Sequence, residues 1–248
     1  MIKQIKAVRP HTPIQYVMGK TKFFGLDFIV DGKVMIPRPE TEILVYTVID
    51  IIDGVKGPAT KSLAGRQGLR VKIIDLGTGS GCIAISLVEA LTKARTDCKM
   101  VASDISEKAL EIARINAAAH AVSERIEFVK SDLFADIDGK FDIIVSNPPY
   151  VSKPEFATLQ KEVLVEPRLA LDGGDDGLDF YRKIIPAAKR YLNESGYLIF
   201  EIGYGQRKKI EKIFERTGGF RISKVMEDHN EIDRVVVARW TPQSDCGQ

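Results

Sequence analysis

The fold of this chain is decided by Val71-Lys-Ile-Ile-Asp-Leu-Gly-Thr-Gly-Ser-Gly81, in which a largely apolar run leads directly into a glycine-rich turn. Residues 71–76 predict a buried strand, and the amphipathic stretch 81–93 predicts the helix that follows it. The same alternation then continues. We expect further strands at 98–103, 126–130, 141–146 and 196–202, and further helices near 106–119, 177–193 and 205–217. This alternation predicts a doubly wound α/β sheet.

The end of the chain departs from this alternation. Residues 220–225 and 234–240 predict two strands with no helix between them. Such a pair is antiparallel, so we expect a mostly parallel, seven-stranded sheet with one antiparallel strand.

The part upstream of the sheet predicts smaller elements. Phe23–Val30 and Lys33–Ile36 flank Asp31-Gly32, which is typical of a β-hairpin with a tight turn. Residues 40–52 have the apolar spacing of a helix, whereas the stretch from 53 to 70 predicts an exposed loop whose role we leave open. We divide the chain into 1–36 (connector and hairpin), 37–70 (helix and linker), 71–240 (main domain) and 241–248 (frayed tail).

Composition narrows the class of protein. The 248 residues carry 36 basic and 34 acidic side chains, a net charge of +2 that offers no general track for a nucleic-acid backbone. The three cysteines are odd in number and lack CxxC spacing, so we expect no disulfide framework and no metal site, and a cytoplasmic location. No apolar run is long enough to span a membrane.

The predicted strand ends carry the polar residues. In a doubly wound sheet, ligands bind beyond the carboxyl ends of the strands, so Asp75 and the turn Gly77-Thr78-Gly79-Ser80-Gly81 are candidate binding residues. A glycine-rich turn can also be only a packing device. Asp104, followed by Ile105, ends the second strand, where a carboxylate can accept both hydroxyls of a ribose or can cap the helix near Ser106.

The third and fourth strands end in two more candidate sites. Asp132 could accept from an adenine amino group while Leu133 covers the ring. Asn147-Pro148-Pro149-Tyr150 forms a rigid polar tip, because proline restricts both itself and the residue before it. The Asn147 amide and the carbonyls beside the prolines can grip a planar NH2 group, and Tyr150 offers a flat face for stacking. The alternative is a strand-ending turn in which Asn147 caps a helix.

These motifs resemble those of a known class of enzyme. Residues 71–150 look like a class I S-adenosylmethionine-dependent methyltransferase of Rossmann-like fold, and NPPY is similar to the motif of enzymes that methylate planar nitrogens. The stretches 12–19, 36–42 and 166–177 further resemble the HemK/PrmC family, which methylates the glutamine amide nitrogen in the GGQ loop of peptide-chain release factors. This likeness covers nearly the whole chain.

The resemblance implies a cofactor, a partner and a set of site residues. S-adenosylmethionine would bind at Asp75, Gly77–Gly81, Asp104, Ile105, Asp132, Leu133 and Asn147, and would leave as S-adenosylhomocysteine. Asn147, Pro148, Pro149 and Tyr150 would hold the acceptor amide, with Arg38 and Glu40 shaping the entrance. We expect a release factor as substrate, a monomer, and no stable binding to nucleic acid or membranes.

One departure leaves the partner in question. Family members carry a helical N-terminal domain before the hairpin, whereas only about a dozen residues precede the first family motif, so we expect that domain to be largely missing. Two other functions stay open. One is an adenine N(6)-methyltransferase acting on DNA or RNA, and the other is a catalytically silent module that binds S-adenosylmethionine.

Overall fold

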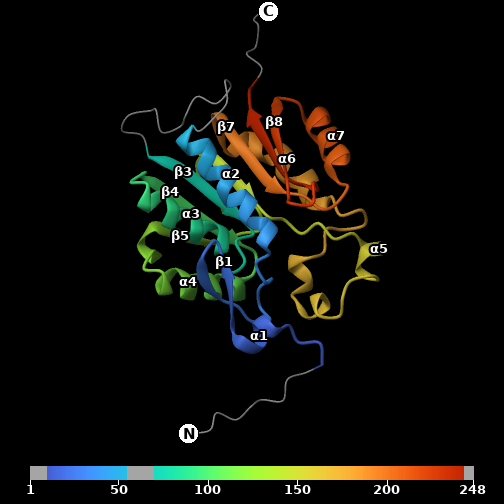
Figure 1. The fold of residues 1–248 in the computed structure, drawn as a ribbon. Helices are drawn as coiled ribbons and strands as arrows, with labels where there is room; N and C mark the ends of the chain where they lie inside the picture. Colours follow the sequence, from blue (N-terminus) through green and yellow to red (C-terminus); the bar gives the residue numbers. More distant parts are fainter. Residues whose placement is uncertain (1–9, 55–69, 243–248) are drawn as a thin grey trace, which may run out of the picture.

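The computed structural model describes residues 10–54 and 70–242, and the statements below concern these residues. The first nine residues of the predicted connector, nearly all of the predicted 53–70 loop and the predicted tail beyond 242 lie outside them. Figure 1 shows the described chain as one central sheet with helices on both faces and a small hairpin beside it.

The main sheet has seven strands within the described residues, in the order β5-β4-β3-β6-β7-β9-β8. The strands are β3 (Val71–Leu76), β4 (Cys98–Asp104), β5 (Ile126–Lys130), β6 (Phe141–Ser146), β7 (Leu192–Glu201), β8 (Phe220–Glu227) and β9 (Asp233–Trp240). β9 runs antiparallel to both of its neighbours, and β3 to β7 are parallel. The predicted sheet is confirmed, except that β7 begins earlier than expected.

Five helices cover the sheet in the described chain. They are α2 (Glu42–Asp53), α3 (Cys82–Lys93), α4 (Glu107–Ala119), α6 (Asp179–Tyr191) and α7 (Arg207–Thr217). Successive residues of β3 point to opposite faces, so Ile73 joins a core with α2 and α3, and Ile74 joins a core with α6 and α7. Both cores are filled by aliphatic and aromatic side chains, as a sheet covered on two faces requires (Figure 1).

The predicted hairpin forms, but its strands and turn lie elsewhere. β1 (Lys20–Phe23) pairs with β2 (Leu26–Ile29) around Phe24 and Gly25, whose φ angles of 50° and 73° fit a tight hairpin turn. Asp31 instead accepts from the amides of Lys33 and Val34 in a local turn. The stretch 33–36, in which Val34 and Ile36 are buried, is therefore not a strand, and the predicted hairpin turn at Asp31-Gly32 is wrong.

Short helices occupy the remaining segments. The chain also contains α1 (Ile14–Met18), η1 (Pro39–Thr41), η2 (Ser123–Arg125), α5 (Lys153–Phe156), η3 (Val163–Val165) and η4 (Arg168–Ala170). The α1 helix falls within the predicted connector, where no helix was expected. It follows Pro13 and ends at Gly19 in the left-handed conformation, which are both ordinary helix-end signals.

The strand order places a topological switch beside β3. The chain runs from β3 outward to β4 and β5, and then returns to the other side of β3 to form β6. In the aligned register, Leu76 lies opposite Ser103 of β4 and opposite Ser146 of β6. The segments that follow these three strands therefore emerge at one rim, where doubly wound folds bind their ligands. None of the described helices is long and apolar enough to cross a membrane.

Candidate active site

The glycine-rich turn after β3 forms the centre of the rim. Gly77, Gly79 and Gly81 all have positive φ angles, of 74°, 56° and 81°, which side chains rarely adopt. A Cβ atom at Gly77 or Gly79 would meet no atom within 4 Å, whereas one at Gly81 would lie 2.9 Å from Ile85 Cδ1. The first two glycines thus border open space, and the third is needed for packing. Packing is confirmed at Gly81, and the approach of a ligand to Gly77 and Gly79 stays a prediction.

Asp75 lies beneath this turn rather than in it. Its side chain is fully buried, and Oδ2 accepts a hydrogen bond of 2.7 Å from Thr78 Oγ1. Burial raises the pKa of the Asp75 carboxyl to about 7, against the lowering effect of the Thr78 hydroxyl. Asp75 therefore anchors the turn from below and does not line the cavity described next.

A cavity of about 330 Å³ opens at the rim and brings most of the predicted residues together. Its wall includes Gly77, Thr78, Gly79, Ser80, Asp104, Ile105, Asp132, Leu133, Asn147, Pro148 and Pro149. Asp75, Gly81, Tyr150, Arg38 and Glu40 are not part of this wall. Sequence reasoning missed the wall residues Val34, Met35, Pro37, Thr41, Phe180 and Lys183, which come from the hairpin exit, η1 and α6.

Asp104 ties two segments of the cavity wall together. Its Oδ2 accepts from the amide of Gly79 at 2.9 Å, and its Oδ1 accepts from the amide of Ser106 at 2.9 Å. The alternative that Asp104 is the helix cap is wrong, because Ser106 is the N-cap of α4 and accepts from Ala109. Burial raises the pKa of the Asp104 carboxyl, and the amide donors oppose this. A carboxylate held in this way still has lone pairs for a ligand hydroxyl.

The turn after β5 carries Asp132 and Leu133. The buried Ser131 hydroxyl donates to the Leu133 carbonyl at 2.9 Å and accepts from the Asp136 amide at 3.0 Å. Leu133 has a positive φ of 52°, so this turn is held in a conformation that a leucine seldom adopts. Asp132 is exposed and Leu133 is half-buried at the cavity wall. Their roles beside an adenine ring stay predictions.

Asn147 is held by a chain of side-chain hydrogen bonds. Its Nδ2 donates to Thr41 Oγ1 at 3.1 Å, and Thr41 Oγ1 donates to Glu201 Oε2 at 2.6 Å. No described residue donates to Asn147 Oδ1, which is the amide atom left to accept from a ligand. The helix-cap alternative for Asn147 is wrong, because α5 is capped by Ser152.

Tyr150 is bonded beneath the rim. Its hydroxyl donates to Glu201 Oε1 at 3.3 Å, and burial together with the Glu201 carboxylate raises its pKa. The backbone carbonyl of Tyr150 accepts from Gln206 Nε2 at 2.9 Å. A stacking role for the Tyr150 ring stays a prediction, and these contacts instead give Tyr150 the role of an anchor for the turn.

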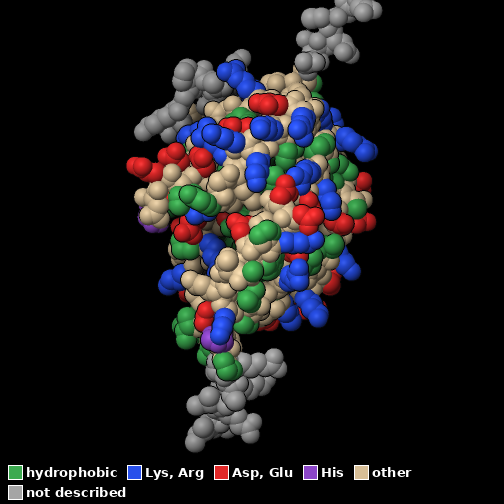
Figure 2. All heavy atoms as spheres, turned by 90° about the vertical axis from the view of Figure 1, so that its right-hand side faces the viewer, with side chains coloured by type: hydrophobic (Ala, Val, Ile, Leu, Met, Phe, Trp, Pro, Cys, Tyr) green, Lys and Arg blue, Asp and Glu red, His purple; other side chains and the backbone are tan. Residues whose placement is uncertain are grey.

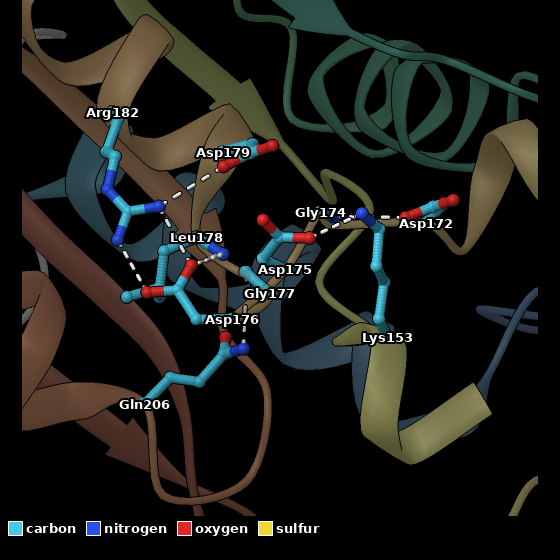
Figure 3. A network of polar contacts seen from close by, with 10 residues as sticks. All are labelled: Lys153, Asp172, Gly174, Asp175, Asp176, Gly177, Leu178, Asp179, Arg182 and Gln206. Carbon is cyan, nitrogen blue, oxygen red and sulfur yellow. Dashed lines mark hydrogen bonds and ion pairs between the residues drawn. The ribbon is translucent and has the colours of Figure 1, made fainter. Parts of the chain in front are cut away.

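The glycine-rich stretch 173–177 packs directly on this anchor. Gln206 Nε2 also donates to the Gly177 carbonyl at 3.3 Å (Figure 3). A Cβ atom at Gly177 would lie 2.4 Å from the Tyr150 carbonyl oxygen, and one at Gly173 would lie 2.8 Å from the Tyr150 backbone. Only glycine permits this approach, so the stretch clamps the turn that carries Asn147.

Ion pairs hold the clamp in place at both ends. Figure 3 shows Lys153 reaching Asp175 and Arg182 reaching Asp176 and Asp179, with distances of 2.5, 2.5 and 3.2 Å. All of these side chains are substantially exposed, so each pair contributes little by itself. They link the stretch 173–177 to α5 on one side and to α6 on the other.

Arg38 makes a buried contact at the edge of the site. Its Nη2 lies 2.5 Å from Oε1 of Glu166, whose side chain is 1% exposed and whose Oε2 accepts from the Ile36 amide at 3.1 Å. This pair joins the segment before α2 to the segment before η4. The prediction that Arg38 and Glu40 shape the entrance is not tested, but Arg38 clearly has a structural partner.

Glu201 is the acidic residue that sequence reasoning missed. It is 1% exposed at the carboxyl end of β7. Burial raises the pKa of its carboxyl to about 7, and the Thr41 and Tyr150 hydroxyls oppose this. The signal was present, because a lone glutamate ends the apolar run Tyr197–Phe200 at the same rim as the other strand-end residues. In the described chain, no cluster of three or more His, Cys, Asp or Glu could hold a metal ion.

Comparison with solved structures supports the same fold. The catalytic domain of hMettl16, solved with a 3′UTR hairpin, superposes with a TM-score of 0.64 at 18% identity, covering 90% of this chain and 77% of that one. A magnesium protoporphyrin IX methyltransferase from Synechocystis PCC 6803, solved with bound SAM, superposes with a TM-score of 0.51 at 18% identity, covering 86% and 87%. At this identity the likeness concerns the fold alone.

The cavity fits S-adenosylmethionine on its own chemistry. Gly77 and Gly79 border open space, so a ligand can approach the backbone there. Asp104 provides an acceptor at the wall, and Ile105, 45% exposed, provides an apolar surface beside it. Together these residues supply an approachable backbone, an acceptor and an apolar face for a nucleoside that carries an amino acid.

Sequence relatives identify the family. The model of the methyltransferase small domain matches residues 60–174. A release factor glutamine methyltransferase of Geobacter sulfurreducens is 41% identical over 92% of this chain and 73% of its own length. Another of that name, from Chlorobaculum tepidum, is 42% identical over 90% of this chain and 72% of its own length. The chain belongs to the family of release factor glutamine methyltransferases, which are S-adenosylmethionine-dependent enzymes of the class I fold.

Proposed function

We propose that this protein transfers a methyl group from S-adenosylmethionine to the side-chain amide nitrogen of the glutamine in the GGQ loop of a peptide-chain release factor. The observation that carries the proposal is the orientation of Asn147. Its Nδ2 is engaged by Thr41, and its Oδ1 is free at the wall of the cavity that the glycine-rich turn also lines. The names of the curated relatives support the release factor as substrate.

The low reactivity of the acceptor nitrogen determines what the site must do. An amide nitrogen is a poor nucleophile, because its lone pair is delocalised into the carbonyl. Asn147 Oδ1 and the backbone carbonyl of Pro148 would accept its two N–H bonds, orient the nitrogen, and stabilise the positive charge that develops there. The proton can leave after transfer, when the nitrogen is far more acidic, so no dedicated base is required.

The other side of the cavity would hold the cofactor. When bound, S-adenosylmethionine supplies an electrophilic methyl group on a sulfonium and leaves as S-adenosylhomocysteine. The backbone at Gly77 and Gly79 would contact the amino-acid part, Asp104 would accept from the ribose, and Asp132 and Leu133 would border the adenine. The Asp75–Thr78 bond would keep the turn in its binding conformation.

A protein acceptor fits the surface better than a nucleic acid does. Figure 2 shows Lys and Arg side chains over the face of α6 and α7 with Asp and Glu side chains among them. Two of the basic side chains of these helices, Arg182 of α6 and Arg207 of α7, are already paired with acidic partners. Phosphate-backbone binding depends on basic side chains that are free to displace counterions. We therefore infer a protein substrate, no stable nucleic-acid complex, and a monomeric enzyme.

Methyl transfer from labelled S-adenosylmethionine tests the proposal directly. The acceptors are a purified release factor, its GGQ Gln→Ala variant, and duplex and single-stranded DNA and RNA. We expect label on the wild-type factor alone, and mass spectrometry should place a single methyl group on the loop glutamine. The Asn147→Ala enzyme serves as the matched control, because it retains the cofactor half of the cavity.

Two results would contradict the proposal. Label on adenine in a nucleic acid would move the enzyme to the N(6)-methyltransferase class. Bound cofactor with no label on any acceptor would identify a silent binding module, or an enzyme whose docking to the release factor needs more than this chain.

A further inference from the structure

Three side chains from distant parts of the sequence form one buried hydrogen-bonded chain beneath the acceptor side of the cavity. Asn147 donates to Thr41, and Thr41 donates to Glu201, with partners 106 and 160 residues apart in sequence. Thr41 and Glu201 are each 1% exposed. Since Ser146 of β6 lies opposite Phe200 of β7, the next residues, Asn147 and Glu201, lie side by side at the ends of these two strands.

The chemistry of the three side chains determines which of them donates and which accepts in each hydrogen bond. Above its pKa of about 7, Glu201 is ionised and its carboxylate can only accept, so it obliges the Thr41 hydroxyl to donate its one proton toward Oε2. The Thr41 oxygen is then left as an acceptor, and the only side-chain group of Asn147 that can donate to it is the amide NH2 group at Nδ2. The Asn147 amide is therefore turned with Oδ1 toward the cavity. The opposite rotamer would place two acceptors, Oδ1 and the Thr41 oxygen, against each other.

We infer that Thr41 and Glu201 are positioning residues that hold the Asn147 amide with its oxygen toward the cavity, and so select an acceptor group that carries N–H donors. This inference rests on the proposed function, in which Asn147 Oδ1 receives an N–H of the substrate amide. With the amide reversed, Asn147 Nδ2 would face a substrate NH2 group, and donor would meet donor.

The contacts of Glu201 suit it to hold Thr41 and not to contact the substrate. Its second oxygen, Oε1, accepts from Tyr150, and its backbone carbonyl accepts from Tyr181 at 2.9 Å. Arg234 also stabilises its charge electrostatically. The carboxylate thus acts on Asn147 through the Thr41 hydroxyl, and it also holds the Tyr150 anchor of the same turn.

The test compares two substitutions at Thr41. Thr41→Val keeps the shape of the side chain but removes the hydroxyl, whereas Thr41→Ser keeps the hydroxyl. We expect Thr41→Val to lower kcat about tenfold or more, with the affinity for S-adenosylmethionine and the KM for the release factor within about threefold of wild type. Thr41→Ser should restore kcat to within about threefold. Equal kcat for Thr41→Val and wild type would overturn the inference.

A third variant separates charge from shape. Glu201→Gln keeps one acceptor but adds two donors, so it no longer obliges Thr41 to donate toward it. We expect kcat to fall severalfold while the protein stays folded, as checked by its melting temperature. Wild-type kcat in Glu201→Gln would show that the carboxylate does not set the direction of the chain.

A readout independent of methyl transfer keeps the inference apart from the proposed function. In the 15N-labelled protein, the Asn147 side-chain NH2 resonances can be assigned by their loss in Asn147→Ala. We expect their exchange with solvent to be slow in wild type and Thr41→Ser, and clearly faster in Thr41→Val. Unchanged exchange in Thr41→Val would refute the positioning role even if the release factor proves to be the wrong substrate.

Discussion

The two sides of the cavity are built by different means. The cofactor side is held by contacts between residues close in sequence: Thr78 bonds Asp75 three positions away, and Gly79 bonds Asp104 25 positions away. On the acceptor side, Asn147 bonds Thr41 across 106 positions, and Thr41 bonds Glu201 across 160. The cofactor side is thus assembled by neighbouring strand ends alone, whereas on the acceptor side two neighbouring strand ends are joined by Thr41 of η1, which the sheet alone does not bring there.

Each side also has one buried carboxyl that anchors it from below, Asp75 or Glu201. Because different contacts hold the two sides, we expect that a substitution can impair one side without the other. A change on one side should alter either cofactor binding or methyl transfer, but not both.

Replacement of Asn147 by Ala should have the largest effect. Loss of the acceptor Oδ1 removes a preorganised hydrogen bond to the developing charge, so turnover should fall about 10²-fold or more. Cofactor affinity, measured by calorimetry, should stay within about threefold, because no residue of the cofactor side is bonded to Asn147. A comparable loss of cofactor affinity would show that the two sides are not separable.

The two buried carboxyls predict a dependence of stability on pH. The pKa of Glu201 is raised from 4.5 to about 7, and that of Asp75 from 3.8 to about 7. Between pH values of about 4 and 7, the two carboxyls keep their protons in the folded state but have lost them in the unfolded state. The free energy of unfolding should therefore fall as pH rises from about 4 to 7, by about 3 to 4 kcal/mol for each group.

Urea denaturation at a series of pH values tests this dependence. Glu201→Gln should remove only the share of the slope that belongs to the acceptor side, and Asp75→Asn only that of the cofactor side. A slope unchanged in both variants would mean that other groups govern the stability between pH 4 and 7.

Asp104→Ala tests the cofactor side by itself. This change removes an acceptor for the ribose and frees the Gly79 amide from its bond, so the affinity for S-adenosylmethionine should fall about tenfold or more. At saturating cofactor, turnover should fall far less than in Asn147→Ala. Calorimetry that shows unchanged affinity would refute the ribose assignment.

Lys22→Ala should have the smallest effect and sets the baseline for the others. Lys22 lies 3.6 Å from Asp27 across the hairpin, and the two side chains are 78% and 58% exposed. Exposed pairs of this kind contribute less than about 1 kcal/mol, so stability, cofactor affinity and turnover should all stay close to wild type. A large change in turnover would instead place the hairpin in the contact with the release factor.

The same contrast explains which predictions from sequence were confirmed. The strands and helices of the main sheet, the antiparallel β9 and the gathering of four strand ends were all predicted, because period-2 and period-3.6 apolar patterns are local properties. The hairpin register was wrong, because Phe24-Gly25 and Asp31-Gly32 are both good turns and only packing selects one. Asn116 contributes to that selection, since its side-chain amide bonds both the Ile29 backbone and the Ser80 carbonyl.

The sequence by itself determined the strands, the mostly parallel sheet and the polar residues at its rim, since each depends on a short pattern and on the geometry of parallel strands. Only the tertiary structure decided what each polar residue touches. It placed Asp104 on the Gly79 amide and made Ser106 the helix cap. It also turned Tyr150 inward and joined Asn147 to Glu201 through Thr41. Such contacts depend on which distant segments pack together, and no local pattern contains that information.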